Sequence, residues 1–454
     1  MRYVSTRGDA PVVEFDDVLV TGLAVDGGLY VPESWPHFEL PDSGDYADVA
    51  AAVIRPFVKG SVIEPDLDRM LRATYAPFRH AEVAPLRRIA DDHHLLELFW
   101  GPTLSFKDYA LQFVGAAFDA VLAARRDTVT VLGATSGDTG SAAIDALAGR
   151  SAVQVVILYP EGRVSDVQRR QMTTVSADNV RAVAVQGTFD DCQRLVKQAF
   201  SDPELRSKHR LAAVNSINWA RVMAQAVYYA WTSTRLRVPF DVAVPTGNFG
   251  NVLAAEVARR GGVPINRMVV GTNSNHGLVD IIESGRVRTT EVVATIAPAM
   301  DIQVPSNFER YLFELVGRRA DLVAEAMQLL AIDGELVLDE AAHARLRERF
   351  IGHWFDQDEI EQAIGSVHGE TGDVFDPHTA IGWLAGFAER GDRPMVSVAT
   401  AHPAKFPDAV RRATGTSPEL PPNLADLMDR PERTQTVSAE LGAVADVLSE
   451  LPLP

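Results

Sequence analysis

Short, continuously apolar runs alternate along most of the chain with longer segments of helical periodicity. Examples of the apolar runs are Val153–Tyr159, Phe240–Val244 and Met268–Gly271. Helix-like segments, such as 189–200 and 218–236, lie between such runs. An uninterrupted apolar run is typical of a strand buried on both faces, and a helix between successive strands allows them to pair in parallel. The pattern therefore predicts an α/β protein whose parallel sheets are covered by helices.

The first ninety residues follow a different pattern. A stretch punctuated by glycine and proline, 21–32, precedes two segments of helical periodicity at 46–58 and 65–75. We therefore expect a separate, mainly helical N-terminal domain over 1–90. The remainder is expected to form a small α/β domain and a large domain built from two parts of the chain, namely 128–212 for the small domain and 91–127 with 213–454 for the large one.

The C-terminal third of the chain is more helical than the middle. The pattern there predicts one strand, at 395–400, and helices at 308–330, 341–350, 357–366 and 438–451. Residues 413–436 are rich in proline and charge and are expected to run over the surface. The stretch 331–352 indicates no particular role.

Composition and charge narrow the class of partner. The chain has 454 residues, of which 46% are hydrophobic and 23% charged, and its formal net charge is -18. This composition is ordinary for a soluble globular protein, and the length corresponds to about three domains of roughly 150 residues. Nucleic acid and anionic membranes would be repelled overall by the negative charge. A small anionic ligand stays compatible, because a pocket can be locally positive.

No segment favours secretion or insertion into a membrane. Residues 1–9 lack the apolar core of a secretory signal. The most apolar helical window, Tyr109–Ala124, is interrupted by polar residues and is too short to span a bilayer. We therefore expect a cytoplasmic protein without a membrane partner.

Cysteine and histidine give no sign of a metal site. Cys192 is the only cysteine, which excludes an intramolecular disulfide and a cysteine-based zinc site. We expect it to be a core thiol on an amphipathic helix. The histidines form no metal-ligand pattern, and His93 and His94 with Glu97 are expected in a polar surface turn.

One lysine is placed where it could be chemically active. Lys107 follows a phenylalanine in the segment Gly101–Asp108, directly before an apolar helical run. Burial there would desolvate the ammonium, lower its pKa and leave a neutral amine able to form an imine with an aldehyde. Taken alone, a solvated surface lysine is the more common explanation of such a position.

Two glycine-rich turns each follow a strand-like run and precede a helix-like one. Their presence favours a chemically active Lys107 over a solvated surface lysine. The segment Thr246–Asn251 would direct free amides and the positive end of a helix at a ligand, as a phosphate requires. The segment Ala134–Gly140, which is rich in hydroxyl groups, would suit a carboxylate. The alternatives are a tight connection without ligand for the first turn and simple helix capping for the second. The turn Thr246–Asn251 is neither a Walker A loop nor a dinucleotide-binding motif.

A third polar cluster precedes the helix-like segment 218–236. Asn215, Ser216 and Asn218 lie between a strand and a helix, and Arg221 falls in the first turn of that helix. Arginine with polar donors at a helix start could bind a second anion, such as a phosphoester. The alternative is helix capping beside a surface arginine.

Together these segments resemble the threonine synthase family. The likeness is carried in order by Gly101–Asp108, the loop 135–140, Asn215–Asn218, Gly247–Gly250 and Ala401–Phe406. The separate N-terminal unit and the His-Pro-Ala-Lys-Phe segment are similar to the longer, bacterial and fungal branch of that family. The resemblance implies the architecture of a fold type II pyridoxal-phosphate enzyme, with two open, mostly parallel twisted sheets flanked by helices, plus the helical N-terminal domain.

The resemblance also implies roles for individual residues. Lys107 would carry pyridoxal 5'-phosphate as a Schiff base and move protons at the substrate's carbon atoms. Thr400 would meet the ring nitrogen and Asp138 the ring oxygen. The full set of expected cofactor residues is Lys107, Asp138, Gly247, Asn248, Phe249, Gly250, Asn251 and Thr400. The expected substrate residues are Thr135, Ser136, Gly137 and Thr139 for the carboxylate, and Asn215, Ser216, Arg221 and Lys405 for the phosphate.

The implied reaction converts O-phospho-L-homoserine and water to L-threonine and phosphate by γ-elimination and β-addition of water. The implied protein is a monomer or weak homodimer. A serine or threonine dehydratase would keep the lysine and the phosphate loop but has no need of Arg221 with Asn215 and Ser216. A cofactor-free α/β binding protein that holds ordinary anions is the alternative from a different class.

Overall fold

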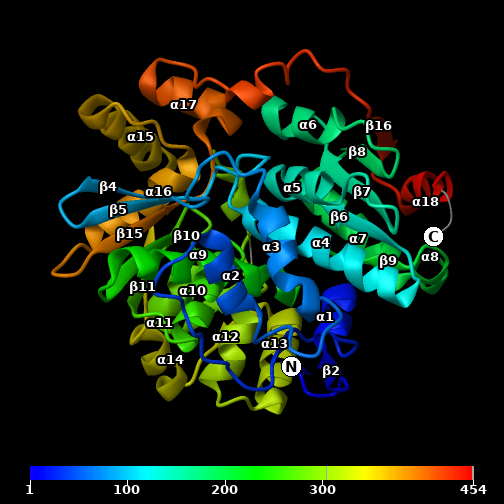
Figure 1. Cartoon of the computed structure of the whole chain (residues 1–454), viewed down its shortest axis with the longest axis horizontal. Helices are drawn as coiled ribbons and strands as arrows, with labels where there is room; N and C mark the ends of the chain where they lie inside the picture. Colours follow the sequence, from blue (N-terminus) through cyan, green and yellow to red (C-terminus); the bar gives the residue numbers. More distant parts are fainter. Residues whose placement is uncertain (303, 452–454) are drawn as a thin grey trace.

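The computed structural model describes residues 1–302 and 304–451, and two parallel sheets dominate it (Figure 1). The larger sheet has six strands in the order β14-β11-β10-β15-β5-β4. Only β4 pairs antiparallel to its neighbour. The strands are β14 (Phe350–Trp354), β11 (Ile265–Thr272), β10 (Phe240–Pro245), β15 (Met395–Ala399), β5 (His93–Glu97) and β4 (Leu86–Ala90).

The smaller sheet has five strands, all parallel, in the order β16-β8-β7-β6-β9. They are β16 (Gln435–Ser438), β8 (Val180–Gln186), β7 (Val153–Pro160), β6 (Val129–Ala134) and β9 (Leu211–Ala212). The central strand β7 is buried along nearly its whole length, because helices cover both faces of the sheet. The α/β class expected from the continuous apolar runs is confirmed.

Helices cover both sheets. Against the larger sheet pack α10 (Gly250–Arg260), α11 (Gly277–Ser284), α14 (Glu340–Arg347) and α16 (Pro377–Ala388). Against the smaller sheet pack α5 (Asp138–Leu147), α6 (Asp166–Thr173), α7 (Phe189–Ser201) and α8 (Pro203–Lys208). The other C-terminal elements are β12 (Arg286–Arg288), α12 (Phe308–Leu315), α13 (Ala320–Asp333), β13 (Glu335–Val337), α15 (Gln357–Thr371), α17 (Pro407–Thr414) and α18 (Leu441–Ser449).

The N-terminal region packs on two long central helices, α4 (Lys107–Arg125) and α9 (Trp219–Leu236). Its own helices are α1 (Phe15–Thr21), α2 (Tyr46–Ile54) and α3 (Leu67–Tyr75). α2 contacts α9, and α3 contacts α4. The region also contains a small antiparallel sheet of β1 (Arg2–Ser5), β2 (Val13–Glu14) and β3 (Tyr30–Pro32), whose strands are too short for an alternation pattern to reveal.

The strand pairing places two segments differently from the division expected from sequence. β4 belongs to the larger sheet and not to the N-terminal region, because it pairs with β5. β16 adds to the edge of the smaller sheet, and α18 packs against α7 there, so this C-terminal segment lies with the smaller sheet. With these two changes, the three-domain division stays a proposal.

Two local predictions were wrong. The segment 308–330 is not one helix, because Gly317 and Arg318 both adopt positive φ (67° and 62°) and separate α12 from α13. His93 to Glu97 is not a surface turn but strand β5. The His93 ring is buried, stacks on Trp383 at 4.2 Å and lies 2.9 Å from the Ser397 hydroxyl. Cys192 is a buried thiol, as expected.

Among the described helices, none combines the length and the apolar character needed to cross a membrane.

Candidate active site

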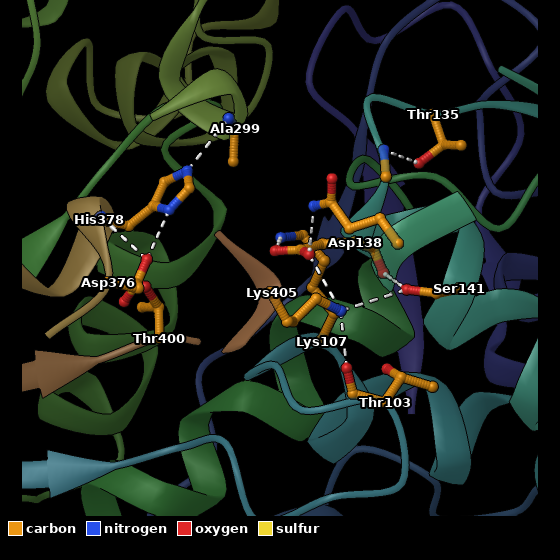
Figure 2. Close-up of polar contacts among 12 residues, drawn as sticks. Thr103, Lys107, Thr135, Asp138, Ser141, Ala299, Asp376, His378, Thr400 and Lys405 are labelled. Atoms are coloured by element: carbon orange, nitrogen blue, oxygen red, sulfur yellow. Dashed lines mark hydrogen bonds and ion pairs between the residues drawn. The ribbon is translucent and has the colours of Figure 1, made fainter. Parts of the chain in front are cut away.

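The expected site residues follow the carboxyl ends of strands in both sheets. Lys107 opens α4 after β5, Thr400 follows β15, and the loop 246–249 joins β10 to α10. In the smaller sheet, the loop 135–137 joins β6 to α5. Ligands of open α/β sheets bind at this edge. Figure 2 shows Lys107, Asp138 and Lys405 converging between the two sheets.

Lys107 and Asp138 form a buried pair. The Lys107 Nζ lies 3.2 Å from Asp138 Oδ2, and both side chains are less than a tenth exposed. Burial lowers the pKa of Lys107 below its ordinary value; Asp138 opposes this shift, while Lys405 and Arg221 reinforce it. The structure therefore places a desolvated amine at the start of α4, and the surface-lysine alternative does not hold.

Asp138 is held as a carboxylate by its neighbours. Burial alone would raise the pKa of Asp138, but the charges of Lys107 and Lys405 lower it further than burial raises it. Gln168 donates from Nε2 to Asp138 Oδ1 at 2.8 Å. Sequence analysis missed Gln168, although Ser165 and Gln168 form a capping box at the start of α6 that could have placed it at a helix end.

The loop before α5 caps its helix without using all of its hydroxyl groups. Thr135 Oγ1 accepts hydrogen bonds from the amides of Gly137 and Gly140, at 2.9 and 2.8 Å. Among the described residues, the hydroxyl groups of Ser136 and Thr139 have no hydrogen-bond partner. Capping is thus the role of Thr135, whereas Ser136 and Thr139 stay available to a ligand.

The loop before α10 has the features that a phosphate needs. Phe249 adopts a left-handed conformation (φ 62°), and no side chain caps α10. A Cβ at Gly247 would lie 2.4 Å from the Ala299 carbonyl, so only glycine fits there. The ring of Phe249 packs on Phe308 and Phe350, which leaves its backbone to face the loop.

Asn251 adds a donor to the same loop. Its Oδ1 accepts hydrogen bonds from the hydroxyl groups of Tyr228 and Tyr229, at 2.6 and 2.7 Å. Its Nδ2 is buried and has no partner among the described residues. A buried donor without a partner is costly, so this orphaned amide and the uncapped helix start fit the phosphate of the expected cofactor.

Arg221 is a buried cation without an ion pair in the described part of the chain. Only 2% of the residue is exposed, one guanidinium nitrogen donates to the Val214 carbonyl at 3.1 Å, and Nε has no partner. Burial lowers the pKa of Arg221 to about 10. The surface-arginine alternative is therefore wrong for Arg221. Asn218 caps α9, as the alternative expected.

In the part of the chain that the structure describes, the other residues expected to bind the substrate phosphate do not form a hydrogen-bonded cluster with Arg221. Asn215 is exposed, and the Ser216 carbonyl accepts a hydrogen bond from Asn307 Nδ2 at 3.0 Å. Within 1–302 and 304–451, the Arg221 side chain makes no hydrogen bond to either residue. Lys405 is buried against Asp138 at 3.1 Å.

Thr400 lies beside a buried network that sequence analysis did not identify. Its amide donates to Thr379 Oγ1 at 3.2 Å, and Thr379 hydrogen-bonds to Asp376. Asp376 also accepts from His378 Nδ1 at 2.7 Å, and His378 Nε2 accepts from the Ala299 amide at 3.2 Å (Figure 2). The only sequence signal was Asp376 followed by proline, a typical helix start.

Metal binding finds no support in the described ranges, where no group of histidine, cysteine and acidic residues is arranged to hold an ion.

Comparisons with known proteins agree with this geometry. Three family models match the chain: "Threonine synthase N terminus" over residues 2–75, "Pyridoxal-phosphate dependent enzyme" over 86–351 and "Threonine synthase, C-terminal" over 379–448. A threonine synthase from Pseudomonas aeruginosa is 45% identical, over 99% of this chain and 98% of its own length.

Solved structures give the same result. A pyridoxal-phosphate-bound threonine synthase from Brucella melitensis superposes with a TM-score of 0.95 and 46% identity, covering 99% of this chain and 98% of its own. Yeast threonine synthase gives a TM-score of 0.92 at 35% identity, over 99% and 98% of the two chains. A threonine deaminase from Solanum lycopersicum, at 14% identity and a TM-score of 0.53, shares the fold alone. This chain belongs to the threonine synthase family of pyridoxal-phosphate-dependent enzymes.

Proposed function

We propose that this protein converts O-phospho-L-homoserine and water to L-threonine and phosphate, with pyridoxal phosphate attached to Lys107. The observation that carries the proposal is the desolvated Lys107 amine with two anion-binding features around it. One is the uncapped start of α10 with the orphaned Asn251 amide. The other is the unpaired buried guanidinium of Arg221. A substrate that carries its own phosphate needs the second feature, whereas a dehydratase does not.

The cofactor would be held by the loop 247–251 through its phosphate and by Thr400 through its ring nitrogen. When bound, pyridoxal phosphate stabilises negative charge that develops at the substrate's α carbon. Asp138 would face the ring oxygen from the start of α5. A hydroxyl at 400 leaves the ring nitrogen neutral, because threonine carries no negative charge to stabilise a proton there.

The substrate would be oriented from both ends. Ser136, Gly137 and Thr139 at the start of α5 would bind the carboxylate, since free hydroxyl groups and amides converge there. Arg221, with Asn215 and Ser216, would bind the phosphate and prepare it as the leaving group.

Lys107 would move the protons. Burial lowers the pKa of its amine, which favours the neutral form that can accept a proton from the α carbon. Asp138, at 3.2 Å, stabilises the resulting ammonium. The same nitrogen can then return a proton to the substrate.

Borohydride reduction tests the role of Lys107. Reduction in the presence of pyridoxal phosphate should fix the cofactor to the peptide that contains Lys107. Lys107→Ala should abolish both the adduct and turnover while the far-UV circular dichroism is unchanged. Lys197→Ala is the matched control, because Lys197 is exposed on α7. An adduct retained at another lysine in Lys107→Ala would refute the assignment.

Assays of product separate the two enzyme hypotheses. A threonine synthase should release phosphate from O-phospho-L-homoserine and form no 2-oxo acid from serine or threonine alone, whereas a dehydratase should do the reverse. We further propose that the protein works in the cytoplasm as a monomer or weak homodimer. The net charge of -18 and the single buried cysteine support this setting.

A further inference from the structure

Lys405 makes a complete set of contacts inside the site. It ends η3 (Pro403–Lys405) and is fully buried. Its ammonium donates to the Thr103 carbonyl at 2.6 Å, to Gln171 Oε1 at 2.9 Å and to Ser141 Oγ at 3.4 Å, and it forms an ion pair with Asp138 Oδ1 at 3.1 Å. An ammonium has three protons, and the three hydrogen-bond acceptors Thr103, Gln171 and Ser141 can take all of them, beside the ion pair with Asp138. Lys405 therefore has no free donor for a substrate phosphate, which is the role expected from sequence.

Asp138 is thus shared between two lysines. Its Oδ2 faces Lys107, and its Oδ1 faces Lys405, as the sticks in Figure 2 show. A buried carboxylate that loses its only cation is strongly destabilised. If Lys107 were the sole partner, each loss of its proton would leave Asp138 uncompensated. Lys405 removes that penalty, because its own charge stays beside the carboxylate.

We propose that Lys405 is a positioning residue that keeps Asp138 ionised and in place while the Lys107 nitrogen gains and loses its proton. The inference rests on the proposed function, in which Lys107 is the cofactor lysine. It assigns Lys405 a role through Asp138 and not through contact with substrate.

The surrounding charges fix the direction of the effect. Lys107 is faced by Asp138 from α5, Lys405 from η3 and Arg221 from α9, and Asp138 is also faced by His378 from α16. Asp108, on the same helix as Lys107, is influenced by Lys405 and by Asp145. Removing the charge of Lys405 takes one positive charge away from Lys107 and leaves Asp138 paired with Lys107 alone. Both changes favour the protonated Lys107 nitrogen.

The test is a pH titration of the absorbance of the bound cofactor in the full-length chain. Lys405→Met should move the midpoint for loss of the Lys107 proton to higher pH by about one unit, the size expected for a nearby charge. Lys405→Arg keeps the charge and should titrate close to the unmodified chain. Lys197→Met, on the exposed side of α7, is the matched control and should not move the midpoint.

A second neutral variant guards against misfolding. If Lys405→Met does not fold, Lys405→Gln should show the same shift, because glutamine can still donate to the Thr103 carbonyl. An unshifted midpoint with a raised KM for O-phospho-L-homoserine would overturn the inference and make Lys405 a substrate ligand. An unshifted midpoint with only a lower Tm would overturn it in favour of a purely structural role. A borohydride adduct at a lysine other than Lys107 would instead refute the proposed function.

Discussion

At the scale of single residues, two buried arginines differ in how their guanidinium groups are hydrogen-bonded. Arg310 is as buried as Arg221, yet each of its three guanidinium nitrogens has a partner, because they donate to the Tyr30 carbonyl, Asn307 Oδ1 and the Ile217 carbonyl. Arg221 donates to one carbonyl and retains a buried Nε without a partner among the described residues. Arg310 is therefore part of the fold, whereas Arg221 is available to an anion.

Arg221→Met should weaken the binding of O-phospho-L-homoserine far more than it weakens the binding of the cofactor. Loss of a charge-assisted hydrogen bond costs about 1.5 to 3 kcal/mol, or roughly 10-fold to 100-fold in affinity. Substrate affinity from steady-state kinetics and cofactor affinity from fluorescence titration measure the two effects separately. Release of the cofactor with unchanged substrate affinity would mean that the two anion sites are exchanged.

The same pair of arginines makes a stability prediction. Arg221→Met should leave the free energy of unfolding of the cofactor-free chain unchanged or raised, because an unpaired buried charge is removed. Arg310→Met should lower it by about 3 kcal/mol or more, since three hydrogen-bond acceptors lose their donor. Urea denaturation of both variants provides the comparison. A large loss of stability in Arg221→Met would indicate that Arg221 is structural.

Thr400 gives a spectroscopic prediction. Thr400→Asp should protonate the cofactor's ring nitrogen, shift the absorbance and raise side products relative to threonine. Thr400→Ser should be close to neutral, because the hydroxyl group is kept. An aspartate variant with an unchanged spectrum and product ratio would show that Thr400 does not contact the ring.

At the scale of elements, local patterns predicted the strands and helices that frame the site. β7 and β10 are apolar runs because both faces of their sheets are covered. The loops before α5 and α10 are rich in glycine because Gly137 has a positive φ and Gly247 lies close to the Ala299 carbonyl. The position of Lys107 at a helix start could also be predicted from the local pattern, because an apolar helix begins at Lys107.

Contacts between distant parts of the chain could not be predicted in this way. Gln168 reaches Asp138, and His378 reaches Ala299, only after the two sheets and their loops are assembled. His93 was misread because its neighbours are polar, although strand pairing buries it. The role of Lys405 depends on three acceptors from three different segments, for which sequence carries no local signal.

The phosphate loop makes a prediction about close approach. Gly247→Ala should weaken pyridoxal phosphate binding, because the added Cβ would lie 2.4 Å from the Ala299 carbonyl and displace the loop. Gly369→Ala, in α15, is the matched control. A Cβ added there meets no neighbouring atom within 4 Å, so the variant should gain about 0.5 to 1 kcal/mol in stability. Cofactor titration and urea denaturation measure the two effects. Equal cofactor affinity in both variants would argue against the loop as the phosphate site.

At the scale of the whole molecule, a strongly acidic chain encloses a locally positive site. The formal net charge is -18, yet Lys107 and Lys405 both pair with Asp138, and Arg221 lies near enough to Lys107 to lower its pKa. Anionic substrate and cofactor are thus attracted only once they enter the site. The N-terminal helices pack on α4 and α9, the helices that begin near Lys107 and Arg221.

Asp108 links the site to stability against pH. Burial raises the pKa of Asp108 to about 7, while Thr103 donates to both of its oxygens and opposes the shift. Between about pH 4 and pH 7 the unfolded chain therefore loses a proton that the folded chain keeps, so rising pH lowers the free energy of unfolding. Asp108→Asn should remove this contribution to the slope, as urea denaturation at a series of pH values would show. An unchanged slope would mean that Asp108 titrates normally.

The most direct test of the central claim is turnover of O-phospho-L-homoserine in water enriched in oxygen-18. Elimination breaks the bond between carbon and oxygen, and water then adds at the β carbon. The label should therefore appear in the hydroxyl group of threonine and be absent from the released phosphate, as mass spectrometry of both products would show. Labelled phosphate with homoserine, or 2-oxobutyrate in place of threonine, would contradict the account.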